Sequence, residues 1–128
     1  MILKGEVIHG KEKGRKIGFP TVNLLPEAGF SLPETGVYAS KVVLMEKPRP
    51  FIGITNVGLR PTADDENGIT IETHILDYEG DLYGQKIELE ICDFLRPIQK
   101  FESMEALGEQ LKKDKENARK LFLKRAEV

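Results

Sequence analysis

The sequence has very little cysteine and histidine. Cys92 is the single cysteine, and His9 and His74 are the two histidines among 128 residues. One cysteine cannot form an internal disulfide, and so few ligands do not make the common structural zinc sites. The composition therefore predicts a single domain that folds around its own hydrophobic core without disulfides or structural zinc, in a reducing compartment such as the cytoplasm.

Long apolar runs and an excess of basic charge are also missing. No apolar stretch approaches the ~18 residues that a membrane-spanning helix needs, and the N-terminal MILKGEVIHG lacks the layout of a secretory signal. The 19 lysines and arginines are balanced by 21 aspartates and glutamates, which gives a net charge of -2. This balance disfavours broad attraction to polyanions, so we expect a soluble protein with no nucleic-acid partner and no membrane partner.

Short β-type segments fill most of the first hundred residues. Ile71, Thr73 and Ile75 fall on one face of their segment and Glu72 on the other, as in a half-buried strand, and residues 86–91 show the same alternation of apolar and charged side chains. YEGDLYG, residues 78–84, is expected to be a hairpin-type connection because it holds two glycines. Regularly spaced strands without intervening helices predict an antiparallel barrel or sandwich. The expected strands are 2–9, 36–45, 49–58, 69–78 and 85–94.

The C-terminal segment changes to a helical period. Apolar residues recur at three- and four-residue steps between about Ser103 and Lys124, which predicts an amphipathic helix. Ser103 is suited to cap its N-terminus, and Glu105 suits the positive end of the helix dipole. Asp114 lies on the apolar stripe, and we interpret it as a polar interruption at the edge of the stripe, outside any site. The chain is thus one domain, residues 1–128, with the barrel at about 1–101 and the helix at about 103–124.

The stretch GRKIGFPTVNLLP, residues 14–26, has two interpretations. In the first it is a turn, because glycine and proline set unusual backbone angles there. In the second, Thr21 and Asn23 point their oxygens to the same side of an extended segment. Hydroxyl and carboxamide oxygens suit Mg²⁺, which takes its other ligands from water and nucleotide phosphate. The basic segment around Arg15 could then cover a polyphosphate, although no GxxxxGK[ST] motif is present.

Several separated segments closely resemble the riboflavin kinase (flavokinase) family, in the order in which that family has them. They are GRKIGFPTVNL, GVY, TNVGLRPT, IETHILDYEGDLYG and FLRPIQKFESMEAL, and the resemblance runs from about Lys4 to Leu121. The sequence is most similar to the kinase module of bacterial bifunctional FAD synthetases. The resemblance implies a mainly β fold, a six-stranded antiparallel Greek-key barrel with a C-terminal amphipathic helix. It also implies an ATP:riboflavin 5′-phosphotransferase that uses Mg²⁺ and converts riboflavin and ATP to FMN and ADP.

The resemblance further implies roles for individual residues. Glu72 matches the catalytic base, and Thr21 and Asn23 of PTVN, where the family usually has PTAN, match the metal ligands. Taken singly, Glu72 would be a solvent-facing strand residue, Arg96 a surface cation and Phe101 a core residue, so it is the joint occurrence of the motifs that favours a site. The implied nucleotide-binding residues are Gly10, Arg15, Thr21, Asn23, Ile75, Asp77 and Tyr83, and the implied flavin-binding residues are Arg96, Gln99 and Phe101.

Other functions remain open from the sequence. A non-catalytic FMN-binding barrel would require neither PTVN nor Glu72, and a CTP-dependent kinase is a second alternative, because some archaeal relatives use CTP. An oligonucleotide-binding barrel predicts a basic groove with stacking aromatics, which the charge and the 7% aromatic content disfavour. FAD synthesis requires an adenylyltransferase, and the barrel and helix account for all 128 residues. We therefore expect this polypeptide to make FMN but no FAD, with an adenylyltransferase module or separate enzyme acting on FMN.

Overall fold

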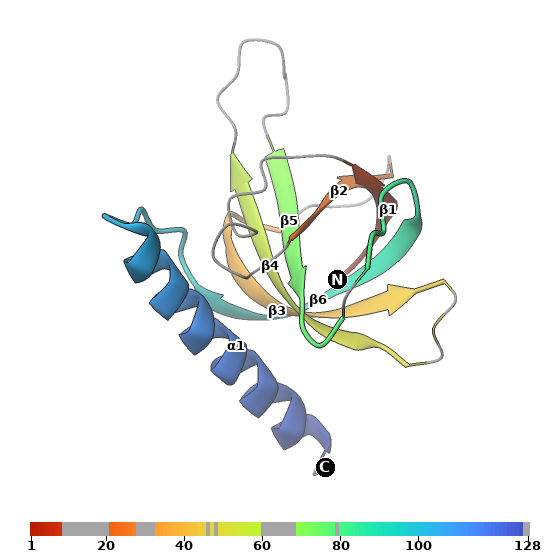
Figure 1. The fold of residues 1–128 in the computed structure, drawn as a ribbon. Helices are drawn as coiled ribbons and strands as arrows, with labels where there is room; N and C mark the ends of the chain where they lie inside the picture. The colour runs from red at the N-terminus through yellow and green to blue at the C-terminus, as the bar shows by residue number, and fades with distance from the viewer. Residues whose placement is uncertain are drawn as a thin grey trace.

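The strands close into one antiparallel barrel, and a single long helix lies outside it (Figure 1). The computed structural model describes residues 1–8, 21–27, 33–45, 47, 49–59, 69–78 and 80–126. Within these ranges the elements are β1 (Ile2–Ile8), β2 (Val22–Pro26), β3 (Gly36–Leu44), β4 (Phe51–Leu59), β5 (Ile69–Ile75), β6 (Lys86–Arg96) and α1 (Met104–Ala126). No helix in these ranges is both long and apolar enough to cross a membrane.

The strand order around the barrel is β1-β2-β5-β4-β3-β6. β3, β4 and β5 follow one another as an antiparallel meander, and the next strand, β6, returns to lie beside β3. This order is a Greek key. The mainly β fold, the six-stranded antiparallel barrel and the C-terminal helix are therefore confirmed.

β2 consists of residues 22–26, which belong to the stretch 14–26. The sequence pattern allowed two interpretations of this stretch, a turn or an extended segment. Asn23 pairs with Ile8 of β1 on one side and with Glu72 of β5 on the other. The segment is therefore a strand that closes the barrel between β1 and β5, and the pattern-based count of five strands was one too few. Local sequence hid it because this short strand directly follows glycine and proline.

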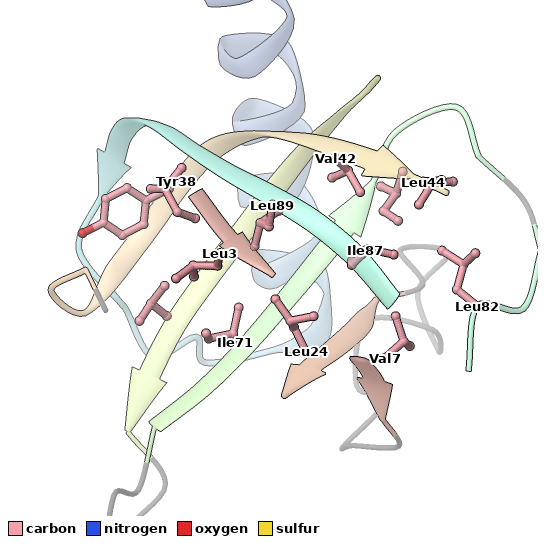
Figure 2. Packing of buried hydrophobic residues seen from close by; sticks show 13 residues of the cluster. Leu3, Val7, Leu24, Tyr38, Val42, Leu44, Ile71, Leu82, Ile87 and Leu89 are labelled. Carbon is pink, nitrogen blue, oxygen red and sulfur yellow. The ribbon is translucent and has the colours of Figure 1, made fainter. Parts of the chain in front are cut away.

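The connection between β5 and β6 is not a hairpin, so that prediction was wrong. β5 pairs with β2 and β4, whereas β6 pairs with β1 and β3. The connecting segment crosses one end of the barrel (Figures 1 and 2), where Gly84 N–H donates to Val7 O at 2.9 Å and Val7 N–H donates to Gln85 O at 2.9 Å. Leu82 of this segment is 3% exposed and packs into the barrel core. Its glycines mark bends in the chain, but they carry no information about which strands pair.

The inward-facing side chains fill the barrel with one apolar cluster (Figure 2). The alternation expected in β5 and β6 is confirmed, because Ile71 and Ile75 point inward from β5 and Ile87 and Leu89 point inward from β6. The buried members are Leu3, Val7, Leu24, Tyr38, Val42, Leu44, Val57, Ile71, Ile75, Leu82, Ile87, Leu89 and Ile91. Opposite faces of the same strands are therefore left for other contacts.

Three buried hydroxyl groups form a hydrogen-bonded chain along the inner wall of the barrel. Ser40 Oγ lies 2.7 Å from Thr55 Oγ1, which lies 2.9 Å from Thr73 Oγ1. All three residues are at most 1% exposed. Gly53 makes room for this chain, since a Cβ there would come 2.7 Å from Ser40 Oγ and 2.9 Å from Thr73 Cγ2. The hydroxyl chain ties β3, β4 and β5 together at one level of the barrel.

α1 covers part of the outer face of the barrel (Figure 1). A second buried cluster joins the helix to the strands and comprises Val37, Ala39, Ile54, Leu76 and Ala118. The predicted cap is confirmed, since Ala106 N–H donates to Ser103 Oγ at 3.1 Å. Asp114 is 1% exposed, so its interpretation as an interruption at the edge of the stripe was wrong. Its carboxylate stays in the interface because Arg96 is bound to it.

Candidate functional site

The strand register places the candidate site residues in one row on the outside of the barrel. Asn23 of β2 is opposite Glu72 of β5, and Glu72 is opposite Asn56 of β4. Asn56 is opposite Val37 of β3, which is in turn opposite Arg96 of β6. Directly opposed residues of antiparallel strands point to the same face. We call Asn23, Glu72, Asn56, Val37 and Arg96 the outer row.

The environment changes along the outer row. Asn23 is 6% exposed, Glu72 is half-buried and Asn56 is exposed, so a carboxylate stands between two carboxamides at one end. Val37, 2% exposed, belongs to the apolar cluster under α1. Adjacent strands lie about 4.8 Å apart, and three strand spacings separate Glu72 from Arg96, so their backbones are roughly 14 Å apart along the row. The row thus has two polar ends, which the apolar Val37 under α1 separates.

Thr21 is the candidate metal ligand that the structure marks most clearly. Its Oγ1 is buried and, within the described part of the chain, is the one buried side-chain nitrogen or oxygen that lacks a hydrogen-bond partner. Such a group is costly unless something binds it. Thr21 lies two residues before Asn23, and the described residues contain no group of three His, Cys, Asp or Glu side chains that could hold a metal. A hydroxyl and a carboxamide are oxygen donors that fit Mg²⁺.

The expected nucleotide residues differ in how accessible they are. Gly10 and Arg15 lie outside the described residues. Ile75 is 6% exposed in the barrel core, so its side chain is turned away from the surface. Tyr83 is 54% exposed, and its N–H donates to Asp81 Oδ1 at 2.9 Å.

Asp77 begins the segment that crosses the barrel end. It has a φ of 60°, in the left-handed region that aspartate tolerates better than most residues. Arg119 of α1 donates to both of its carboxylate oxygens at 3.0 Å. The hydrogen bond from Arg119 is the main reason that the pKa of Asp77 lies below its ordinary value. This expected nucleotide residue is therefore tied to the helix.

The expected flavin residues lie at the end of β6 and just after it, where Arg96 contacts Phe101 and α1. The Arg96 guanidinium carbon is 5.7 Å from the centre of the Phe101 ring, within the range of a cation–π contact. Phe101 is half-buried and Gln99 is exposed. The structure thus brings Arg96 and Phe101 together and gives Gln99 no comparable contact among the described interactions.

Sequence reasoning missed three residues that contact this site or stand in its row. Asn56 lies in the TNVGLRPT segment, but only the register puts it opposite Glu72. Asp114 and Gln110 come from α1, where Gln110 Nε2 donates to Asp114 Oδ1 at 3.0 Å. The available signal was an aspartate on an apolar stripe, because a buried carboxylate requires a partner.

The comparison with protein families decides what kind of domain carries this arrangement. A family model described as Flavokinase, riboflavin kinase, matches residues 1–122. The chain belongs to the riboflavin kinase family. Among relatives of this riboflavin kinase domain is the bifunctional riboflavin kinase/FMN adenylyltransferase of Listeria monocytogenes, 38% identical over 121 residues. The match covers 94% of this chain but only 38% of the length of that relative.

Solved structures support the same fold. A chain from Streptococcus pneumoniae described as a macrolide-efflux protein superposes with a TM-score of 0.84 at 34% identity, and the match covers 92% of this chain and 38% of that one. The riboflavin kinase of Trypanosoma brucei superposes with a TM-score of 0.66 at 22% identity, over 96% of this chain and 80% of that one. The second match extends the barrel-and-helix architecture to a distant riboflavin kinase.

Proposed function

We propose that this domain transfers the γ-phosphoryl group of ATP to the ribityl 5′-hydroxyl of riboflavin, giving FMN and ADP. The outer row carries the proposal, because it joins the Asn23–Glu72 end to Arg96 across five strands. Riboflavin likewise has two different ends, a tricyclic ring and a primary hydroxyl. Membership of the riboflavin kinase family supports the same assignment.

In this proposal Thr21 and Asn23 hold Mg²⁺ together with the ATP phosphates. The Thr21 hydroxyl, which has no hydrogen-bond partner among the described residues, and the carboxamide of the buried Asn23 fit that role. When bound, the metal supplies positive charge that stabilises the transferring phosphoryl group. The chain itself contributes fixed oxygen donors on β2 and just before it, so the position of the phosphates is set relative to Glu72 on the neighbouring strand.

Glu72 acts on the hydroxyl that attacks. A hydroxyl is a weaker acid than a carboxylic acid by about 11 pKa units, so complete deprotonation before the attack would cost about 15 kcal/mol. A turnover of about 10 s⁻¹ allows a total barrier of only about 16 kcal/mol. Glu72 therefore orients the hydroxyl and accepts its proton late, as the new O–P bond forms and the bond from the γ-phosphorus to the ADP oxygen breaks.

The flavin ring lies at the other end of the row in this proposal. Arg96 supplies hydrogen-bond donors and Phe101 supplies an aromatic surface beside the guanidinium. Arg96 and Glu72 both point outward, from strands that are three places apart in the closed barrel. In this proposal the ring is held near Arg96 and Phe101, and the ribityl chain extends from it toward Glu72. Binding at one end thus orients the reacting group at the other.

The test is to incubate the purified protein with riboflavin, Mg²⁺ and either ATP or CTP, and to measure FMN by chromatography. We expect FMN with ATP, and we expect Glu72→Gln to lower kcat by about 10²-fold or more with little change in riboflavin affinity. Glu88→Gln is the matched control, because Glu88 lies on the outer face of β6 and pairs with Lys4 at 3.2 Å.

Three outcomes would contradict the proposal in different ways. Unchanged riboflavin in all nucleotide conditions, from folded protein that binds FMN, would make the domain a non-catalytic flavin-binding barrel. FMN formed with CTP and not with ATP would change the phosphoryl donor. A Glu72→Gln variant that keeps more than half of the wild-type kcat would remove Glu72 as the base.

A further inference from the structure

Among the residues that the structure describes, Asp114 is the most deeply buried charged residue that the proposed reaction leaves without a role. It is 1% exposed in the middle of α1. Arg96 binds it through two nitrogens, with Nε 2.9 Å from Oδ1 and NH2 2.8 Å from Oδ2. Gln110, one turn earlier, donates to Oδ1 at 3.0 Å. The carboxylate therefore accepts hydrogen bonds on both oxygens, and it is held from the helix and from β6.

The contacts of Arg96 leave part of its guanidinium available. Arginine has five N–H donors. Nε–H and one N–H of NH2 go to Asp114, and one N–H of NH1 goes to the carbonyl of Pro97 at 3.3 Å. Within the described part of the chain, the other two donors, one on each terminal nitrogen, have no hydrogen-bond partner. The Asp114 pair thus fixes the plane of the guanidinium, and with it the direction of the two remaining donors.

We propose that Asp114 is a positioning residue. It holds Arg96 in the orientation in which Arg96 binds the flavin ring of riboflavin. The inference rests on the proposed function and extends it to a residue on α1 that touches neither substrate. A long, flexible arginine loses side-chain freedom when it binds a ligand, and a fixed carboxylate removes much of that freedom beforehand. Without Asp114, Arg96 samples other rotamers, and riboflavin binding must select the productive one.

A purely structural role of Asp114 makes a different prediction. If the pair only attached α1 to the barrel, any change that loosens the helix would weaken riboflavin binding equally. Leu121, which packs in the cluster under α1, provides that comparison because it lies in the same interface without being part of the Arg96 contacts. Glu116, exposed on α1, provides a control for removing one negative charge from the helix.

The experiment measures riboflavin affinity by quenching of flavin fluorescence, together with steady-state kinetics, for wild type, Asp114→Asn, Arg96→Lys and the double variant. We expect Asp114→Asn to raise the riboflavin Kd and KM by about ten-fold, with kcat within about three-fold and the KM for ATP unchanged. Because Asp114 acts through Arg96, the double variant should bind riboflavin no more weakly than Arg96→Lys alone. Glu116→Gln should match wild type.

Leu121→Ala is measured at a temperature at which its free energy of unfolding equals that of Asp114→Asn. Under these conditions its riboflavin Kd should stay within about two-fold of the wild-type value. An equal rise in both variants would show that Asp114 only docks the helix. If Asp114→Asn does not fold, Gln110→Ala removes one hydrogen bond to the carboxylate. It should raise the riboflavin Kd by a smaller factor, and an unchanged Kd would then overturn the inference.

Different results would overturn the positioning role of Asp114 and the proposed kinase activity. Wild-type protein that turns over riboflavin, combined with an Asp114→Asn variant of unchanged Kd, would overturn the positioning role alone. Folded wild-type protein that neither binds nor phosphorylates riboflavin would overturn the proposed function and this inference with it.

Discussion

Thr55→Val interrupts the hydroxyl chain in the barrel at its central member. Thr55 makes both bonds of the chain, at 2.7 Å to Ser40 and 2.9 Å to Thr73, and the valine leaves two buried hydroxyls without this partner. Two such groups at about 1–3 kcal/mol each, offset by about 0.8 kcal/mol for the extra buried methyl group, give a loss of roughly 3 kcal/mol in the free energy of unfolding. For a domain of this size we expect the Tm to fall by about 9–15 °C in a thermal melt followed by circular dichroism.

Two comparison variants test the reasoning. Thr73→Val removes an end of the chain and one hydrogen bond, so its loss in the free energy of unfolding should be about half that of Thr55→Val. The triple variant Ser40→Ala, Thr55→Val, Thr73→Val removes every member and should be more stable than Thr55→Val alone, because no hydroxyl is left unpaired. Equal losses for Thr55→Val and Thr73→Val, or a triple variant whose loss is the sum of the single losses, would refute the argument.

The remaining predictions concern the site, the barrel packing and the helix contact. Asn23→Ala should raise the Mg²⁺ and ATP concentrations needed for half-maximal FMN formation together, and an unmoved Mg²⁺ dependence would make Asn23 a structural residue. Gly53→Ala should lower the Tm, because its Cβ would come 2.7 Å from Ser40 Oγ, and a Tm equal to wild type would contradict the close packing. The pKa of Asp77 is lowered by Arg119, so this pair stabilises the fold above the ordinary aspartate pKa and loses its effect as pH falls through the lowered value. Asp77→Asn, which retains the left-handed backbone preference, should therefore flatten the acid limb of a pH–stability curve slightly at low salt, and an acid limb identical to wild type would rule out the contribution.

Much of the fold followed from patterns that are local in the chain. The two-residue alternation in β5 and β6 correctly identified which side chains enter the core, because successive side chains of a strand point to opposite faces whatever the strand pairs with. Ser103 was identified as a helix cap because its hydroxyl needs only the next turn of the same segment. The order of the motifs identified the family, because separated segments had to match together.

What the tertiary structure decided involves partners that are distant in sequence. The glycines of 78–84 indicate bends, but closure of the barrel places β6 between β1 and β3 and turns an expected hairpin into a crossing segment. The register, which depends on how all six strands fit together, sets Glu72 between Asn23 and Asn56 and brings Arg96 onto the same row. The sequence pattern indicated that Asp114 was a polar interruption of an apolar stripe, because its partner Arg96 is 18 residues away in the chain, on β6. Only the packing of α1 on the barrel brings the two charges together in a place that excludes water.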